Sequence, residues 1–500
     1  MAVFLNVRRI DIDTGGHNQI VLLRGRDADA FGIVPGDQLQ ISYGRKKTVA
    51  VADITHYSIR HGEIGAFNDV WQTLKVRDGQ AVKVEILARP LSVNAIKKKL
   101  LGQEINAREI RSIIEDIVKR RLSSIETTYF VASGYVKPYT DRELIAMVKA
   151  MSSTGDTFKW SGHRVVDKHS IGGLAGNRTT LITVPIIASC GLLIPKTSSR
   201  AITSPSGTAD TMEVLAPVTF SAERVRHIVK HLGGCLIWGG GLSIAPADDL
   251  IIRVSKPLSL EPYDKMIVSI LAKKVAMGVK YLIIDLPFGQ GTKVPNLAVG
   301  TKIADRFKRI GRAFNMTIEV KFDPAHQPIG SGIGPALEAR DVLRVLQQKD
   351  NRPRDLEKKS VELAGRLLEI SGRVTNGQGR NLAIHQLKSG QAWEKMQAII
   401  RWQGGRWNID SESVLQGAVT KVIKAKQNGR VSQINNRAIN DIARTLGAPD
   451  HKLAGIYLHR KIGQTVKRGQ PIMTLYSPNA SRLKLASQTL ARPNVIRITR

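Results

Sequence analysis

The sequence predicts a multidomain α/β protein, and three observations lead to that prediction. The chain has 500 residues, which is more than one hydrophobic core usually organises. From about residue 161, short apolar runs typical of strands alternate with segments of helical periodicity, which indicates a sheet covered by helices. The residue pattern also changes near residue 90, from β-type to helical, and near residue 405, where strand-like runs with glycine turns begin. We therefore predict four domains, with the bounds 1–90, 91–160, 161–405 and 406–500.

The first and last of these domains are predicted from β patterns. Residues 1–90 contain alternating runs, among them "DQLQISYG", "KKTVAVADI" and "QAVKVEILA", which are separated by glycine and aspartate turns. Residues 406–500 contain "GIYLHRKIGQTVKRGQPIMTLYS", which is typical of strands joined by glycine turns. We therefore expect a β domain at the N-terminus and an α+β domain at the C-terminus.

The two middle domains differ from each other in their periodicity. In the second domain, Asn106 with Glu109 and Thr140 with Glu143 form capping boxes ahead of apolar residues at helical spacing. This segment is therefore predicted to be a small all-helical domain. In the third domain, the runs "RVVD", "LLIPKT", "YLIIDLPFG" and "MTIEVKF" alternate with helical patterns. We predict a large α/β domain with a central sheet.

The composition excludes membrane-spanning and disulfide-bonded classes of protein. The longest apolar run is broken by Thr183, Pro185 and Ser189, and it is shorter than a membrane span. The first residues, "MAVFLNVRRIDID", lack the apolar core of a signal peptide. Only two cysteines are present, Cys190 and Cys235, so neither a disulfide framework nor a thiolate metal site is available. We expect a cytoplasmic protein.

Two polar, glycine-containing loops carry the candidate chemistry. In "DKHSIGG" (167–173) a lysine, a histidine and a serine precede flexible backbone that can form an anion-binding nest. Taken alone, this stretch also fits an ordinary strand-to-helix turn with a solvated lysine. The second loop, "KTSSRAITSPSGTADTME" (196–213), gathers hydroxyls around one arginine, and alone it fits a serine-rich surface loop. Together the two loops predict one phosphate pocket at the carboxyl ends of the strands.

These loops, with "APAD" (245–248), "SILAKK" (269–274) and "IIDLPFGQG" (283–291), resemble the thymidine/pyrimidine-nucleoside phosphorylase family. The resemblance covers roughly residues 90–500 and is greatest to the long branch, which includes AMP phosphorylases. The N-terminal segment, with "FGIVPGDQLQI", is similar to the extra domain of that branch. The resemblance implies a double-psi-like β-barrel there, and a helical domain that is joined in space by about 247–282.

The resemblance also implies reversible phosphorolysis and roles for individual residues. Inorganic phosphate attacks C1′ of a nucleoside or nucleotide and releases the free base. His169 and Glu261 match residues with catalytic roles near the base. By position, the residues that match phosphate ligands are Lys168, Ser170, Gly173, Thr180 (or its neighbour Thr179), Ser198 and Thr208. Those that match substrate-binding positions are Ser199, Arg200, Thr203, Ser204, Ser269, Lys273 and Lys293. The family's base-contacting arginine has no clean counterpart, because Arg253 is out of register.

Glu261 is the most informative departure from the AMP phosphorylases, in which an aspartate protonates the leaving purine. Glutamate keeps the carboxyl group but moves it by about 1.5 Å. It can act as the general acid if burial raises its pKa, or it can merely stabilise a helix start beside Pro262. The long architecture and the hydroxyls of "SSRAITS" favour AMP. We predict a pentosyltransferase of the thymidine phosphorylase type, with AMP phosphorylase, which forms ribose 1,5-bisphosphate, as the alternative.

Two other classes of protein fit less well. Anthranilate phosphoribosyltransferases, which share the fold by analogy, need acidic metal ligands beside their glycine-rich loop, and "SIGGLAGN" offers none. We therefore expect no metal and no cofactor, with phosphate as a co-substrate. The net charge of +33 suits anionic ligands, but aromatic residues make up only 5%, too few for a nucleic-acid stacking surface. We expect small-molecule substrates, no specific nucleic acid, no membrane, and a homodimer or higher homo-oligomer.

Overall fold

The computed structural model describes residues 2–14, 19–201, 204–255, 262–415, 417–490 and 495–499. The chain forms two compact units. The first unit contains Met1–Gly155 and Ala245–Ala272, and the second contains Asp156–Ile244 and Lys273–Arg500. In the ranges that the structure describes, no helix has both the length and the apolar composition needed to cross a membrane.

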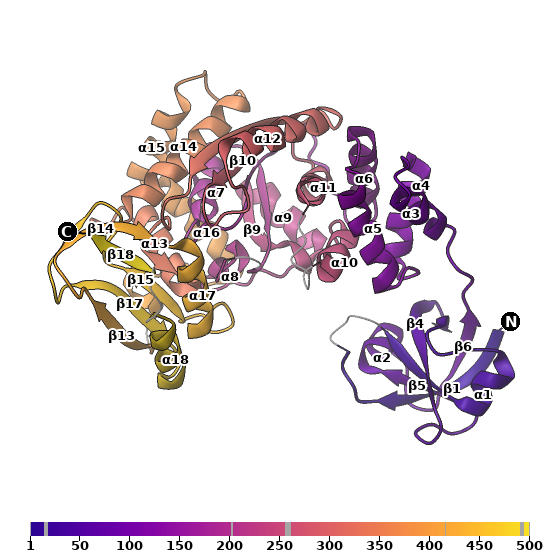
Figure 1. Ribbon diagram of the computed structural model, residues 1–500. Coiled ribbons are helices and arrows are strands. Elements are labelled where there is room, and N and C mark those ends of the chain that lie inside the picture. Colours follow the sequence, from indigo (N-terminus) through magenta and orange to yellow (C-terminus); the bar gives the residue numbers. More distant parts are fainter. Residues whose placement is uncertain are drawn as a thin grey trace. The chain divides into compact units, whose positions relative to one another are not determined.

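The N-terminal part of the first unit is a small β-barrel (Figure 1). It is closed by six strands in the order β1-β5-β2-β4-β3-β6. The strands are β1 (Ala2–Ile10), β2 (Ile20–Arg24), β3 (Gln38–Tyr43), β4 (Lys46–Thr55), β5 (Glu63–Phe67) and β6 (Ala81–Ile86), with the short helices α1 (Gly25–Phe31) and α2 (Asn68–Leu74). Alternate residues such as Val21 and Leu23, or Leu39 and Ile41, fill the interior because side chains alternate along a strand. The expected β domain is confirmed, and its double-psi character stays a prediction.

The rest of the first unit is a helical bundle built from two stretches of chain. The first stretch supplies α3 (Ser92–Leu100), α4 (Ala107–Val118), α5 (Ser124–Val136) and α6 (Asp141–Ser153). The second supplies α10 (Pro246–Ser255), which packs against α4 and α5, and the start of α11 (Tyr263–Ala276). The capping boxes predicted at Asn106 and Thr140 are both present. The all-helical domain is therefore confirmed.

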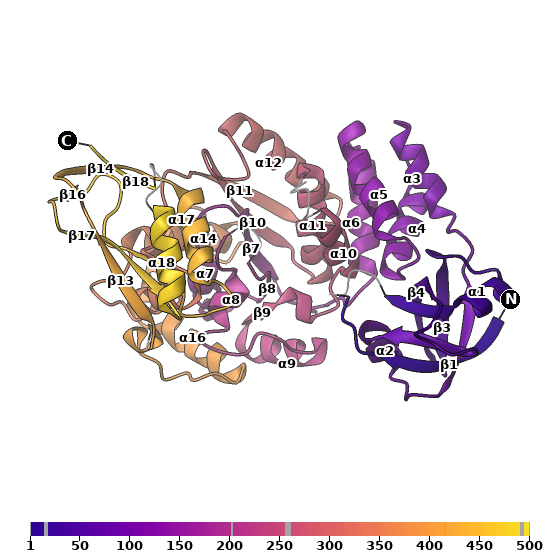
Figure 2. The same ribbon diagram turned by 60° about the horizontal axis from the view of Figure 1, so that its bottom comes forward.

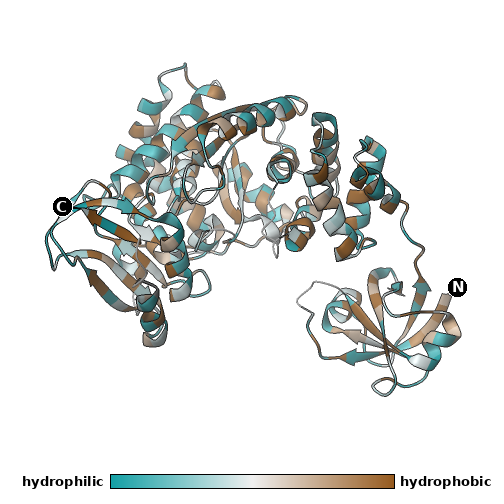
Figure 3. Ribbon diagram, in the orientation of Figure 1, coloured by the Kyte–Doolittle hydropathy of each residue, from teal (hydrophilic) through white to brown (hydrophobic). Residues whose placement is uncertain are grey.

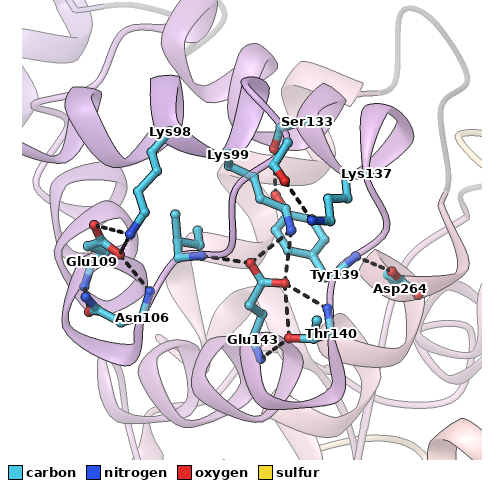
Figure 4. Close-up of polar contacts among 12 residues, drawn as sticks. Lys98, Lys99, Asn106, Glu109, Ser133, Lys137, Tyr139, Thr140, Glu143 and Asp264 are labelled. Carbon is cyan, nitrogen blue, oxygen red and sulfur yellow. Dashed lines mark hydrogen bonds and ion pairs between the residues drawn. The ribbon is translucent and has the colours of Figure 1, made fainter.

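A buried ion pair holds the bundle together at the start of α6 (Figure 4). The Glu143 carboxylate accepts hydrogen bonds from Lys99 Nζ at 2.9 Å and from the backbone N–H of Ile105 at 3.1 Å. It also accepts the Thr140 backbone N–H at 2.7 Å, and Lys99 Nζ lies 4.4 Å from the ring centre of Tyr139. Both charged side chains are buried. Burial alone would raise the pKa of Glu143, but the Lys99 ammonium and these N–H groups lower it.

The second unit is organised around five parallel strands that lie side by side in the order β11, β10, β7, β8, β9 (Figure 2). They are β7 (Val166–Ser170), β8 (Ile194–Ser198), β9 (Gly234–Trp238), β10 (Tyr281–Phe288) and β11 (Thr317–Pro324). A parallel bridge between Val165 and Leu193 joins β7 to β8. The four runs predicted as strands in this region form β7, β8, β10 and β11, and β9 was not predicted. The α/β domain with its central sheet is confirmed.

Helices surround this sheet. They are α7 (Thr179–Ser189), α8 (Thr208–Met212), α9 (Ala222–Leu232), α12 (Leu297–Arg312), α13 (Pro335–Leu346), α14 (Arg354–Ile370), α15 (Gly379–Lys388) and α16 (Gln391–Trp402). Helix α7 is apolar and buried along nearly its whole length, and α14 packs against it and against β10. Helices such as α12 carry hydrophilic and hydrophobic residues together (Figure 3), the pattern of amphipathic helices that cover a core.

The C-terminal part of the second unit is an α+β domain, as expected. One antiparallel sheet has the order β12-β15-β17-β13 and another has the order β16-β14-β18. The strands are β12 (Gly332–Ile333), β13 (Val419–Lys424), β14 (Gly429–Ile434), β15 (Gly455–Leu458), β16 (Thr465–Val466), β17 (Pro471–Ser477) and β18 (Ile496–Thr499), with the helices α17 (Asn436–Leu446) and α18 (Ala480–Leu490). Strand β12 precedes α13 in the chain, so the α/β segment supplies an edge strand to this sheet.

Candidate functional site

Lys168 on β7 is the centre of the first polar loop. Its Nζ donates hydrogen bonds to Thr179 Oγ1 at 2.5 Å and to Thr180 Oγ1 at 3.3 Å, and it also contacts Ser170 Oγ. Lys168 and Ser170 share one face of the strand because side chains alternate. The lysine is only 1% exposed. Burial lowers the pKa of Lys168 to about 7, against the opposing charge of Asp285. The predicted strand–loop–helix arrangement thus brings the lysine and three hydroxyls together.

Asp285, in the carboxyl half of β10, binds this loop through hydrogen bonds and an ion pair. Its Oδ2 accepts hydrogen bonds from Ser170 Oγ at 2.7 Å and from Asn177 Nδ2 at 2.9 Å, and it lies 3.8 Å from Lys168 Nζ. Burial would raise the pKa of Asp285, but the charges of Lys359 and Lys168 hold it well below its usual range. This aspartate lies within the "IIDLPFGQG" motif, but its partners are distant in the sequence and could not be inferred from the motif.

A second buried cluster lies on the other face of β7. Asp167 forms ion pairs with Lys196 at 3.2 Å and with Lys274 at 2.5 Å. Lys196 Nζ also donates to the backbone oxygen of Lys168 at 2.6 Å. Burial holds the pKa of His169 well below its usual value, and the charges of Lys274 and Lys196 act in the same direction. The His169 imidazole is therefore neutral at pH 7 and can exchange hydrogen bonds with a base.

Glycines let the first loop approach neighbouring backbone closely. Gly173 has φ +111°, and a Cβ on it would lie 3.0 Å from the Thr292 Cα. Gly176 has φ +69°, and a Cβ there would lie 2.1 Å from the Ile329 oxygen. Both positions favour glycine because the left-handed region and the space exclude a side chain. Gly173 therefore places the loop directly against the segment that carries Lys293.

The second loop folds back on itself around Asp210 and Glu213. Arg200 donates to both Glu213 carboxylate oxygens at 2.6 Å and to Asp210 at 3.2 Å, and it stacks on Trp238 at 4.8 Å. The guanidinium expected to bind substrate is thus paired with protein carboxylates. Ser198 Oγ, at the end of β8, donates to the Ile237 oxygen at 3.1 Å.

The two loops meet through Arg178, a residue that the sequence analysis did not single out. Its guanidinium contacts Ser206, Ser204 and Thr208 of the second loop, and it pairs with Glu338 of α13. Its position directly before Thr179 and Thr180 was the one feature of the sequence that pointed to a role in the site.

Helix α17, in the C-terminal domain, contacts both loops. Asn440 Nδ2 lies 3.4 Å from the Gly173 oxygen, and Arg444 Nη2 lies 3.4 Å from the Ser204 oxygen. Asn436 Nδ2 lies 3.4 Å from the Ala325 oxygen, just beyond β11. The C-terminal domain therefore helps to hold the backbone of the predicted site.

The other predicted residues belong to the first unit or to other segments of the second unit, or they lie outside the described residues. Ser269 lies in the first unit, where its Oγ donates to Asp248 Oδ2 of the "APAD" motif at 2.7 Å. Lys273 begins the next segment of the second unit. Ser199 is exposed at the start of the second loop. Glu261 and Thr203 lie outside the described residues.

The arrangement on β7 and β10 suits an anion. Within the described part of the chain, no group of three His, Cys, Asp or Glu side chains is placed to hold a metal ion. The first loop instead presents hydroxyls, a buried ammonium and glycine backbone, which are donors for phosphate oxygens. The expectation of metal-free phosphate binding stays a prediction.

Comparison with protein families divides the chain in the same order. Residues 162–393 match the α/β domain of a glycosyl transferase family, and residues 93–155 match the helical bundle domain of a glycosyl transferase family. Residues 430–497 match the C-terminal domain of pyrimidine nucleoside phosphorylases.

Relatives match the chain over nearly its whole length. An AMP phosphorylase of Methanosarcina acetivorans is 42% identical over 492 residues, which is 98% of this chain and 96% of the relative. An AMP phosphorylase of Methanococcus maripaludis is 41% identical over 490 residues, with the same coverage. The crystal structure of anthranilate phosphoribosyltransferase from Thermus thermophilus has a TM-score of 0.52 and 18% identity, and covers 62% of this chain and 99% of that one. This last likeness shows the fold alone.

These relatives overturn the prediction of thymidine phosphorylase activity, because proteins with 41–42% identity over 98% of the chain carry the name AMP phosphorylase. The error came from Glu261. The added methylene of Glu261 does not exclude AMP, because aspartate and glutamate present the same acid. The long architecture and the hydroxyl-rich second loop pointed the other way.

Proposed function

The chain is a pentosyltransferase of the long branch of the pyrimidine-nucleoside phosphorylase family, and from this premise we propose that it catalyses the phosphorolysis of AMP. The observation that carries the proposal is the identity of 42% over 98% of the chain to an AMP phosphorylase. AMP and inorganic phosphate give adenine and ribose 1,5-bisphosphate. The substrate class is a nucleoside 5′-monophosphate, with no cofactor.

In the proposed reaction, a phosphate oxygen forms a bond to C1′ of the ribose while the bond from C1′ to the purine nitrogen breaks. The electron pair of that bond moves into the purine, which takes up a proton. The transition state has oxocarbenium character, so a nearby phosphate stabilises it as well as attacking it. Glu261 supplies the proton, and the neutral His169 contacts the base.

The contacts of the first loop support this role for phosphate. Lys168 Nζ already lies among the hydroxyls of Ser170, Thr179 and Thr180. A buried ammonium with three hydroxyls is a strong set of donors for a dianion, because a charge-assisted hydrogen bond is about twice as strong as a neutral one. Ser198 and Thr208 of the second loop match ligands of the same phosphate, and the remaining hydroxyls of "SSRAITS" are available for the 5′-phosphate of the nucleotide.

The test is a substrate panel. Purified protein is incubated with phosphate and each of AMP, CMP, UMP, thymidine and uridine, and the released base is measured by chromatography. Adenine release from AMP, with ribose 1,5-bisphosphate as the second product, is the expected result. Release of base from the nucleosides but not from AMP would contradict the proposal. Adenosine serves as the matched control, because it lacks only the 5′-phosphate.

We further infer a homodimer or higher homo-oligomer in the cytoplasm, and a barrel of the double-psi type. The two cysteines, which are both buried and carry thiols whose pKa burial raises, suit a reducing compartment. Light scattering after size-exclusion chromatography, on the full chain and on a chain without residues 1–90, measures the assembly and the share of the barrel in it.

A further inference from the structure

Arg178 is a buried guanidinium that spans the two polar loops. It directly precedes α7, at the end of the segment that joins the first loop (167–173) to this helix. Its Nη2 donates to the Ser206 oxygen at 2.6 Å and lies 3.4 Å from Ser204 Oγ, while Nη1 lies 3.5 Å from Thr208 Oγ1. Ser204 and Thr208 are both among the predicted substrate and phosphate contacts. One rigid group thus contacts three residues of the second loop at once.

Glu338 fixes the direction of this guanidinium. Its Oε2 accepts the Arg178 Nε–H at 2.6 Å and the Thr211 hydroxyl at 2.8 Å. Its Oε1 lies 3.4 Å from the Gly334 backbone nitrogen. Arg178 is 7% exposed and Glu338 is 1% exposed. Removal of either partner would leave a buried charge without compensation, which is far more costly than loss of a surface pair.

The pair therefore connects three segments of the fold. Arg178 supplies the start of α7, Thr211 belongs to α8, and Glu338 belongs to the first turn of α13. A lysine could not replace the arginine in this role. The planar guanidinium directs five N–H groups in a fixed fork, whereas an ammonium is a single rotating point charge.

We propose that Arg178, held by Glu338, is a positioning residue for phosphate. It sets the Ser204 and Thr208 hydroxyls of the second loop relative to Lys168 and the threonines of the first. The proposal rests on the proposed function in one respect, namely that the two loops form the phosphate site. It assigns to Arg178 no contact with the reacting atoms.

The test measures the binding of inorganic phosphate to the full-length protein by isothermal titration calorimetry, without nucleotide. Arg178→Lys is expected to weaken phosphate binding by about tenfold or more. An ammonium lacks the fixed set of N–H groups that contacts Ser204, Ser206 and Thr208 together. The matched control is Arg344→Lys. Arg344 is also buried and pairs with Glu412 at 2.6 and 2.8 Å, and its other partner is Tyr457. This control should bind phosphate like the wild type.

A second variant separates positioning from a purely structural role. Arg178→Met combined with Glu338→Leu removes both buried charges, and such replacements are often neutral for stability. We expect this protein to recover its thermal stability relative to Arg178→Met alone, but not its affinity for phosphate. Recovery of both would overturn the proposal, and so would an unchanged phosphate affinity in Arg178→Lys.

Failure of the positioning role and failure of the proposed AMP phosphorolysis would give different experimental results. If the wild type binds phosphate but releases no adenine from AMP, the proposed substrate is wrong and the Arg178 comparison still stands. If the wild type binds no phosphate, the positioning role is overturned directly. In active protein, the KM for phosphate should rise more than the KM for the nucleotide in Arg178→Lys.

Discussion

Lys359 Nζ on α14 lies 2.8 Å from Asp285 Oδ1 on β10. The same ammonium lies 3.1 Å from Asp323 Oδ2, and the other carboxylate oxygen of Asp285 faces Lys168 at 3.8 Å. Charges therefore alternate through the core from α14 to the first polar loop. Because Asp285 is the main group that raises the pKa of Lys168, this row of charges determines whether Lys168 is protonated near pH 7.

Asp285→Asn should weaken phosphate binding. Without the carboxylate, the pKa of Lys168 falls below about 7, so most of the lysine is uncharged at neutral pH. We expect the phosphate affinity at pH 7 to fall by about tenfold or more, because a pKa shift of one unit is a tenfold change. Calorimetric titration with phosphate measures this. Asp323→Asn is the control, since it removes the other partner of Lys359. An equal loss in both variants would contradict the role of Asp285.

The binding of sulfate should weaken as the pH rises above 7. Sulfate remains a dianion across this range, so its pH dependence reports the protein alone. The bound state requires charged Lys168, whose pKa in the free protein is about 7. Affinity is therefore full below that pKa and falls by about tenfold per pH unit above it. Titrations between about pH 6 and 9 measure this slope. A constant affinity up to pH 9 would show that Lys168 stays charged.

Glu261→Gln should lower the turnover of AMP by about 10²–10⁴-fold, which is the typical contribution of a general acid. Glutamine keeps the size of the side chain but cannot give its proton to the purine. Glu261→Asp should retain most of the activity, because it keeps the acid. The measurement is the initial rate of adenine release at saturating phosphate. If the amide variant retains near-normal turnover, another group protonates the base.

Glu143→Ala should destabilise the helical bundle by about 3–5 kcal/mol, the cost of leaving one charge of a buried pair alone. Lys99 would remain buried without its partner. Glu109→Ala is the matched control, because Glu109 also closes a capping box but pairs with the partly exposed Lys98. We expect about 1 kcal/mol there. Urea unfolding followed by circular dichroism compares the two. Equal losses would mean that the Lys99 contact contributes nothing.

Local parts of the structure could be predicted because their signals are local. The capping boxes at Asn106 and Thr140 depend on residues three positions apart, and both are present. The turn after Lys168 likewise lies within one strand–loop–helix unit. Strand β9 was missed because its five residues are apolar without alternation, and such a short run does not distinguish a buried strand from a buried helix.

The partners of the candidate site could not be predicted because they are distant in the sequence. Asp285, Glu338 and Lys359 reach the first loop from β10, α13 and α14, and only the order of the strands brings them there. The surplus of positive charge was visible, but not which lysines are buried against carboxylates. Arg178 was visible too, but its contacts to the second loop depend on how both loops fold.

Strand β12 has a consequence for how the polypeptide reaches its final form. Ile333 pairs with Ile456 and Gly332 pairs with Tyr457, so the strand that is synthesised first completes a sheet whose other three strands follow later in the chain. Gly334 leaves no room for a side chain against the Ala454 oxygen, at 2.3 Å from an added Cβ. A fragment that starts at residue 406 would therefore present an unpaired β15 edge and tend to associate with other chains. Strand β15 must therefore be synthesised before β12 can pair in its sheet.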